Sequence, residues 1–99
     1  MLENVNFIKI INYLEKIVKN RSVENKKTYT SILLSKHISR ISQKVGEEAV
    51  ELVIASNYSD KKEIVCESAD LLFHLMLLWN KTGVSLEDIA KELESRKNE

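Results

Sequence analysis

Apolar residues recur at spacings of three and four along most of this chain, and such spacing is typical of helices that bury one face. Between the apolar segments the sequence turns polar, which is typical of loops and turns. We therefore expect an all-α fold, a small bundle of four to five helices. The predicted helices cover about residues 4–19, 28–36, 38–56, 61–81 and a last segment from 85, with a loop over 20–27 and a turn over 57–60.

The residues at the ends of these segments fit helix termini. Thr28 and Asp60 can cap the segments that follow them. Ser85 can open the last helix, because Asp88 stands three residues later, where a capping box needs an acidic partner. Gly83 suits the end of the preceding helix, since glycine adopts positive φ easily. The helix boundaries are thus predicted from their chemistry as well as from their periodicity.

Composition limits the class of protein. The chain has 99 residues, of which 43% are hydrophobic and 30% charged, and these values predict one packed domain over residues 1–99. Fifteen basic and fifteen acidic residues balance, so charge gives no indication of a nucleic-acid or membrane partner. The first residues do not resemble a signal peptide, and no apolar run is long enough to span a bilayer. We expect a cytoplasmic protein.

Three features of the predicted helices bear on packing. The segment 61–81 is apolar nearly all round, more than a short chain can easily cover, so we expect a homodimer. Cys66 lies in that segment among apolar residues, and we expect it to be buried. Gly46 lies within a helix, where glycine costs about 1 kcal/mol relative to alanine. Close helix packing or the close approach of a ligand would explain Gly46.

Two predicted helices carry carboxylates within their apolar stripes. Glu48 and Glu51 are one turn apart in the stretch KVGEEAVELVIAS (residues 44–56), and Glu67 and Asp70 are one turn apart in the next helix. A carboxylate beside apolar surface is unfavourable unless a positive group meets it. Antiparallel packing across the turn could bring the two pairs together. Such a set offers only hard oxygen ligands, which suit Mg²⁺ or Mn²⁺ rather than Zn²⁺.

Other polar residues accompany the carboxylates. Lys36, Arg40 and Lys44 precede them at four-residue spacing and could bind phosphates, or could form a solvated helix face that pairs with acidic neighbours. His74 shares the polar stripe of Glu67. It could be an outer ligand, although a core histidine that hydrogen-bonds a neighbouring carboxylate fits its surroundings better.

Several stretches resemble known families. The run EEAVE followed by ESAD is similar to the E-E-x-x-E … E-x-x-D signature of the all-α nucleoside triphosphate pyrophosphohydrolases. More narrowly, the chain resembles the phosphoribosyl-ATP pyrophosphohydrolase family over about residues 28–96. The stretches that carry this likeness are TYTSIL (28–33), QKVGEEAVE (43–51), ESADLLFHL (67–75) and GVSLEDIAKELESR (83–96). The family commonly has glycine where this chain has His37.

The resemblance implies an activity and a site. It implies a Mg²⁺-dependent homodimer that hydrolyses phosphoribosyl-ATP to phosphoribosyl-AMP and pyrophosphate, the second step of histidine biosynthesis. The residues that it implies are Glu48, Glu51, Glu67 and Asp70 as metal ligands, Glu47 and Glu48 as catalytic residues, and Tyr29, Lys36, Arg40, Lys44 and His74 at the substrate.

Two other functions fit the same residues. A house-cleaning pyrophosphohydrolase acting on deoxynucleotides or damaged nucleotides would use the same carboxylates. A non-catalytic helical dimerisation module would use the acidic stripes only for buried ion pairs, without any metal.

Overall fold

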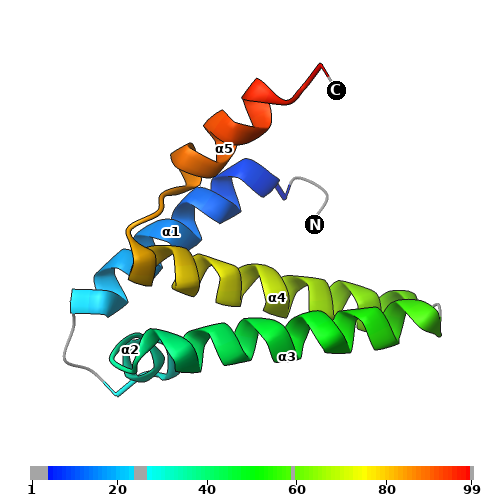
Figure 1. The fold of residues 1–99 in the computed structure, drawn as a ribbon, viewed down its shortest axis with the longest axis horizontal. Coiled ribbons are helices and arrows are strands. Elements are labelled where there is room, and N and C mark those ends of the chain that lie inside the picture. Colours follow the sequence, from blue (N-terminus) through cyan, green and yellow to red (C-terminus); the bar gives the residue numbers. More distant parts are fainter. Residues whose placement is uncertain (1–4, 24–26, 59, 99) are drawn as a thin grey trace.

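The computed structural model describes residues 5–23, 27–58 and 60–98, which form five helices and no strand (Figure 1). The all-α prediction is confirmed. The two longest helices, α3 and α4, lie side by side as an antiparallel hairpin, and α1 and α2 pack against one end of it. The helices are α1 (Phe7–Val23), α2 (Tyr29–Leu34), α3 (Ile38–Asn57), α4 (Lys61–Thr82) and α5 (Leu86–Ser95).

The predicted caps are confirmed. Thr28 and Asp60 each accept a hydrogen bond from the backbone N–H three residues on. Ser85 and Asp88 form the reciprocal capping box at the start of α5. Gly83 ends α4 with a φ of 77°, in the left-handed region that favours glycine. Local side-chain chemistry therefore defines most of the helix ends.

The end of α1 differs from the prediction. The helix continues through Val23, so the predicted loop over 20–27 is wrong for residues 20–23. Ser31 of α2 donates a hydrogen bond to the Arg21 carbonyl at 3.0 Å, a tertiary contact that supports this last turn and that local polarity does not reveal. Residues 24–26 of the predicted loop, Asn4 of the predicted first helix and residue 59 of the predicted turn lie outside the described residues.

His37 stands where the resemblance leads us to expect glycine. Its φ of −62° is accessible to any residue, and its side chain accepts a hydrogen bond from the Ser39 N–H as the N-cap of α3. The turn between α2 and α3 therefore forms without glycine.

The core lies at one end of the α3–α4 hairpin. We call this the closed end; Val18, Leu33, Leu34, Ile41 and Leu77 are buried together there. The opposite end projects away from α1, α2 and α5 (Figure 1). We call it the open end; its exposed apolar residues are Val50, Val53, Ile54, Tyr58 and Val65.

Cys66 corrects one prediction. The residue is exposed, not buried. It lies in the half of α4 that belongs to the open end, where α3 is the helix that packs against α4. The apolar neighbours of Cys66 in the sequence thus face solvent on one side of α4 as well as α3 on the other.

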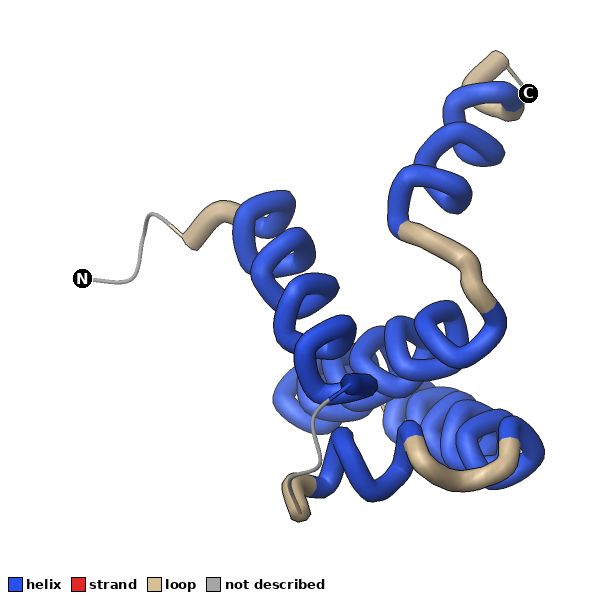
Figure 2. The backbone as a smooth tube through the Cα atoms, turned by 90° about the vertical axis from the view of Figure 1, so that its left-hand side faces the viewer, coloured by secondary structure: helices blue, strands red, loops and turns tan. Residues whose placement is uncertain are grey.

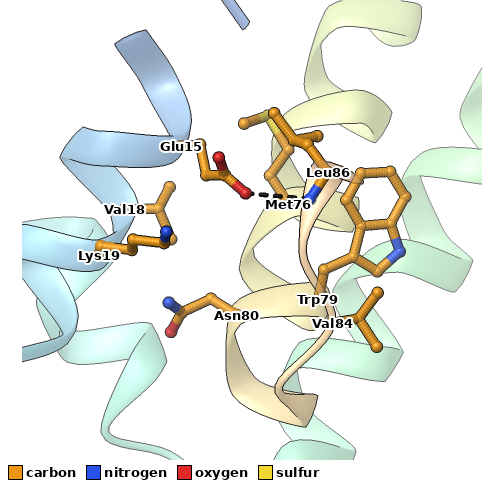
Figure 3. A pocket seen from close by; sticks show the side chains of 8 residues that line it. All are labelled: Glu15, Val18, Lys19, Met76, Trp79, Asn80, Val84 and Leu86. Atoms are coloured by element: carbon orange, nitrogen blue, oxygen red, sulfur yellow. Dashed lines mark hydrogen bonds between the residues drawn. The ribbon is translucent and has the colours of Figure 1, made fainter. Parts of the chain in front are cut away.

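The last helix joins the others sparsely. The Glu15 carboxylate of α1 accepts a hydrogen bond of 3.0 Å from the backbone N–H of Leu86, the first residue of α5 (Figure 3). Figure 2 shows α1 and α5 leaving α4 in different directions. An apolar groove between them includes Phe7, Ile8 and Leu93, all of which are exposed. In the described part of the chain, each helix is too short or too polar to cross a membrane.

Candidate active site

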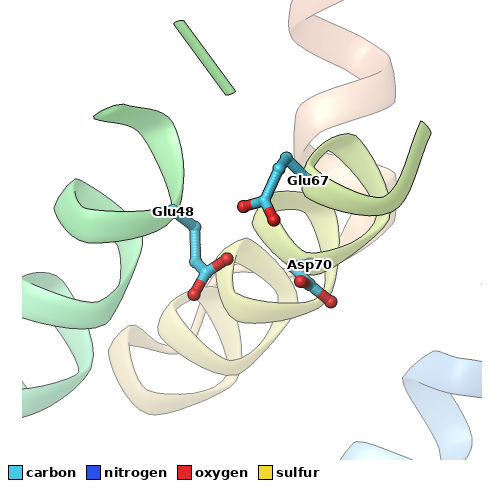
Figure 4. Close-up of side chains that lie close together, drawn as sticks. All are labelled: Glu48, Glu67 and Asp70. Atoms are coloured by element: carbon cyan, nitrogen blue, oxygen red, sulfur yellow. The ribbon is translucent and has the colours of Figure 1, made fainter. Parts of the chain in front are cut away.

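Three carboxylates meet across the α3–α4 hairpin. Glu48 of α3 and Glu67 and Asp70 of α4 each offer an oxygen, and these three atoms lie within 4.8 Å of one another (Figure 4). Antiparallel packing brings Glu48 and Asp70 to one level, because they are equally far from the connecting turn, and Glu67 lies one helical turn from Asp70 on α4. The expected meeting of the two acidic pairs is therefore observed for three of its four members.

Two of the carboxylate oxygens have no hydrogen-bond partner in the described part of the chain. Within the described residues, the Oε2 atoms of Glu48 and Glu67 are buried and accept no hydrogen bond. Lys44 brings its Nζ to 3.9 Å from Glu48, but toward Oε1. A buried acceptor without a partner is unfavourable. A divalent cation would satisfy such hard oxygens, so the residues present fit Mg²⁺ or Mn²⁺.

The neighbouring carboxylates change the protonation of Glu67. Protonated Glu67 can share its proton with the carboxylate of Glu51, and this contact is the largest cause that raises the pKa of Glu67 to about 7. Partial burial and the negative charges of Glu51, Glu48 and Asp70 act in the same direction. Without a cation, the cluster therefore retains a proton at pH values where an ordinary glutamate is ionised.

The other two glutamates of the motif lie at the margin. Glu51 is exposed and lies beside Glu67, outside the three-carboxylate cluster. Glu47 is also exposed; it accepts a hydrogen bond of 3.0 Å from Gln43 and pairs with Lys44 at 3.6 Å. The Gln43 hydrogen bond, aided by Lys44, lowers the pKa of Glu47. Gln43 is not among the predicted site residues, although its spacing of four from Glu47 is a signal for such a contact.

The three basic residues differ in their surroundings. Lys44 is half-buried and bridges Glu47 and Glu48. Lys36, in the turn before α3, and Arg40, in its first turn, have exposed side chains. Lys44 thus belongs to the cluster, while the other two lie along an exposed edge that leads to it.

His74 and Tyr29 contact each other across 45 residues of sequence. The His74 Nε2 lies 2.7 Å from the Tyr29 hydroxyl, and its Nδ1 lies 2.8 Å from the backbone carbonyl of Asp70. His74 is buried, and both its ring nitrogens are engaged within the chain. His74 is thus a core histidine, as expected, but the expected carboxylate partner is wrong: its partners are the backbone carbonyl of Asp70 and the Tyr29 hydroxyl.

Among the described residues, Gly46 has no close neighbour that explains the absence of a side chain. A methyl group added at its Cα would meet nothing within 4 Å among the described residues. Close packing against another helix of the same chain is therefore wrong as an explanation. The remaining interpretation is an approach from outside the chain, and Gly46 lies on a surface that Glu47 and Glu51 also line.

Residues 11–97 match the family model described as phosphoribosyl-ATP pyrophosphohydrolase. The chain belongs to the phosphoribosyl-ATP pyrophosphohydrolase family. The match begins at Ile11, within α1, so the likeness extends further toward the N-terminus than the motifs of residues 28–96 indicate. The resemblance and the prediction of a hydrolase are confirmed, and a non-catalytic module does not agree with this membership.

Relatives of two lengths share this family. A phosphoribosyl-ATP pyrophosphatase of Pyrobaculum aerophilum is 47% identical over 88% of this chain and 94% of its own length. The phosphoribosyl-ATP pyrophosphatase of Pyrobaculum islandicum has the same identity and coverage. The histidine biosynthesis bifunctional protein HisIE of Photobacterium profundum is 44% identical over 89% of this chain and 43% of its own length. The chain thus spans nearly all of the first two relatives and less than half of the bifunctional one.

Proposed function

We propose that this chain hydrolyses phosphoribosyl-ATP to phosphoribosyl-AMP and pyrophosphate, as a step of histidine biosynthesis. Family membership and relatives named for this activity support the proposal. The observation that carries it is the cluster of Glu48, Glu67 and Asp70, with two buried oxygens that accept no hydrogen bond from the described residues. A nucleotide pyrophosphohydrolase needs such oxygens to hold a cation against the phosphates.

The same cluster supports Mg²⁺ as the cofactor, with Mn²⁺ as an alternative. Glu48, Glu67 and Asp70 would hold the ion, and Glu51 is near enough to Glu67 to take part. When bound, Mg²⁺ neutralises the carboxylates, attracts phosphate oxygens and acidifies a nearby water. Carboxylate oxygens without a nitrogen or sulfur donor favour these hard ions.

The remaining residues of the chain have distinct roles in this proposal. Lys44 offers a cation beside the cluster, and Lys36 and Arg40 extend positive charge toward the turn before α3, where phosphates of the substrate can bind. Glu47 is ionised at neutral pH, and its Gln43 hydrogen bond lowers its pKa further. An ionised carboxylate accepts hydrogen bonds, so Glu47 would orient a water molecule and is a weak base.

The assay for this function compares substrates. With Mg²⁺, the purified protein should release pyrophosphate from phosphoribosyl-ATP, and much less from dUTP or dCTP. Chelation of the metal should abolish the release, and Mn²⁺ should restore it in part. Rapid hydrolysis of a deoxynucleotide with none of phosphoribosyl-ATP would instead identify a house-cleaning enzyme. No hydrolysis of any nucleotide, with or without Mg²⁺, would contradict both enzymatic functions.

We also propose that the chain is a homodimer and works in the cytoplasm, where its charged substrate would be made. The open end supports self-association, because Val53, Tyr58 and Val65 stay exposed there. Light scattering should give about twice the chain mass of 11.4 kDa at micromolar concentration. A monomer that melts cooperatively under these conditions would contradict the dimer.

A further inference from the structure

The contact between Tyr29 and His74 determines where its protons lie. The Asp70 carbonyl oxygen can only accept, so the His74 Nδ1 at 2.8 Å must carry a proton. In the neutral ring Nε2 then has a lone pair, and the Tyr29 hydroxyl at 2.7 Å donates its single proton to it. The two rings meet edge to face, with centroids 5.9 Å apart. His74 thus orients the Tyr29 hydroxyl.

This arrangement leaves the Tyr29 oxygen as an acceptor. Its proton is committed to His74, while 55% of the residue's surface is exposed. An oxygen in that state attracts O–H or N–H groups and repels phosphate oxygens. The role of Tyr29 is therefore the opposite of that of Lys44, whose ammonium group attracts phosphates.

Lys44 and His74, the partner of Tyr29, lie at the same level of the hairpin. Glu48 is level with Asp70 across α3 and α4. Lys44 is one turn before Glu48, and His74 is one turn after Asp70, so the antiparallel packing places both on the next level. A nucleotide whose triphosphate binds at the carboxylates can extend its sugar to this level.

We propose that Tyr29, oriented by His74, accepts a hydrogen bond from a ribose hydroxyl of the ATP portion of the substrate. This inference rests on the proposed function. Tyr29 would favour the sugar over a phosphate at that point, and His74 would be a positioning residue that does not touch the substrate.

The first experiment replaces Tyr29 with phenylalanine, which keeps the ring and removes the acceptor. Loss of one neutral hydrogen bond should raise KM for phosphoribosyl-ATP about three- to tenfold, with kcat and the Mg²⁺ dependence nearly unchanged. Tyr13→Phe is the matched control, because Tyr13 is 57% exposed, on α1. It should leave KM unchanged. A lower Tm for Tyr29→Phe with an unchanged KM would show a purely structural role and overturn the proposal.

The second experiment distinguishes the hydrogen bond of the His74 Nε2 from that of its Nδ1. In His74→Gln the longer side chain can place its carbonyl oxygen near the former Nε2 position and still accept from Tyr29. In His74→Asn the shorter amide can reach the Asp70 carbonyl alone. We expect a KM closer to wild type for His74→Gln than for His74→Asn. Equal KM values for the two variants would contradict the orienting role. In the wild-type protein, ¹⁵N NMR should find the His74 proton on Nδ1.

The third experiment identifies the group that donates to Tyr29. Phosphoribosyl-ATP made from 2′-deoxy-ATP or 3′-deoxy-ATP lacks one of the two hydroxyls. With one of these analogues, the difference in KM between wild type and Tyr29→Phe should disappear. A difference that persists with both analogues would mean that the donor lies elsewhere, in the phosphoribosyl group or the base, and would overturn the proposal. If the wild-type protein releases no pyrophosphate, the proposed function fails as well; if it is active and only the KM prediction fails, the function stands.

Discussion

The two ends of the α3–α4 hairpin have similarly apolar sequences but different surroundings. At the closed end, Ile41 and Leu77 are fully buried, with α1 and α2 packed around them. At the open end, Val53 and Val65 remain more than half exposed. The carboxylate cluster lies between the two. Apolar periodicity therefore indicates which face of a helix is suited to burial, but it does not show whether a helix of the same chain packs against that face.

The largest expected effect concerns the closed end. Leu77→Ala should lower the free energy of unfolding by about 2–5 kcal/mol, because it leaves a cavity in the core. Val65→Ala, at the open end, should change it by less than about 0.5 kcal/mol in dilute protein. Urea unfolding measures both. If Val65→Ala destabilises as strongly as Leu77→Ala, and more so as concentration rises, a second chain covers the open end.

The second effect concerns the cluster between the two ends. Asp70→Asn should lower pyrophosphate release by at least about 100-fold, more than the loss of an outer-shell partner typically does. The stability of the metal-free protein should stay the same or rise, since one of the mutually repelling charges is removed. Melts with and without Mg²⁺ provide the measurement. A loss of about 3–5 kcal/mol without metal would instead indicate a broken structural ion pair.

The third effect depends on pH. The pKa of Glu67 is about 7 in the fold, above its ordinary value of 4.5. The raised pKa stabilises the fold fully below pH 4.5, where Glu67 is protonated, and this contribution is lost as the pH rises through about 7. The metal-free protein should therefore become less stable between about pH 4.5 and 7. The stability of Glu67→Gln should not show this fall with pH, because glutamine does not titrate. Mg²⁺ binding should strengthen over the same range, because the ion displaces the proton. If wild type and Glu67→Gln show the same dependence of stability on pH, the raised pKa does not belong to Glu67.

The smallest effect concerns Gly46. Gly46→Ala should stabilise the metal-free protein by about 0.5–1 kcal/mol, since alanine favours the helix and the added methyl group meets no atom of the described chain. The same methyl group should impair substrate hydrolysis or dimer formation, if either approaches this surface. Kinetics and light scattering distinguish these outcomes. A more stable variant with unchanged activity and assembly would show that nothing approaches Gly46.

Much of the fold follows from local sequence chemistry. Thr28, Asp60 and Ser85 cap helices as predicted, because a cap involves only residues a few positions apart. The meeting of Glu48 with Asp70 was also predictable, since a short turn forces two long helices to pack antiparallel. The candidate site could thus be located before its geometry was known.

The remaining features depend on contacts between distant segments. The contact of Tyr29 with His74 spans 45 residues and has no local signal. The position of Glu51 at the margin depends on the helix rotation, which spacing determines only within a broad sector. Cys66 is exposed because, among the described helices, α3 is the one that packs on this half of α4 and it leaves the other side to solvent. In each case the sequence specifies the face of the helix, and its tertiary neighbour decides the outcome.

The hydrogen bond from Leu86 to Glu15 has a consequence for motion. This bond anchors the start of α5, while much of the apolar surface along α1 and α5, including Phe7 and Leu93, remains exposed. Elements with few buried contacts open locally at a lower free energy than the core does. The amides of α5 should therefore exchange with solvent through a local undocking that leaves the hairpin intact. The chain then has two cooperative units, and the carboxylate cluster lies in the slower one.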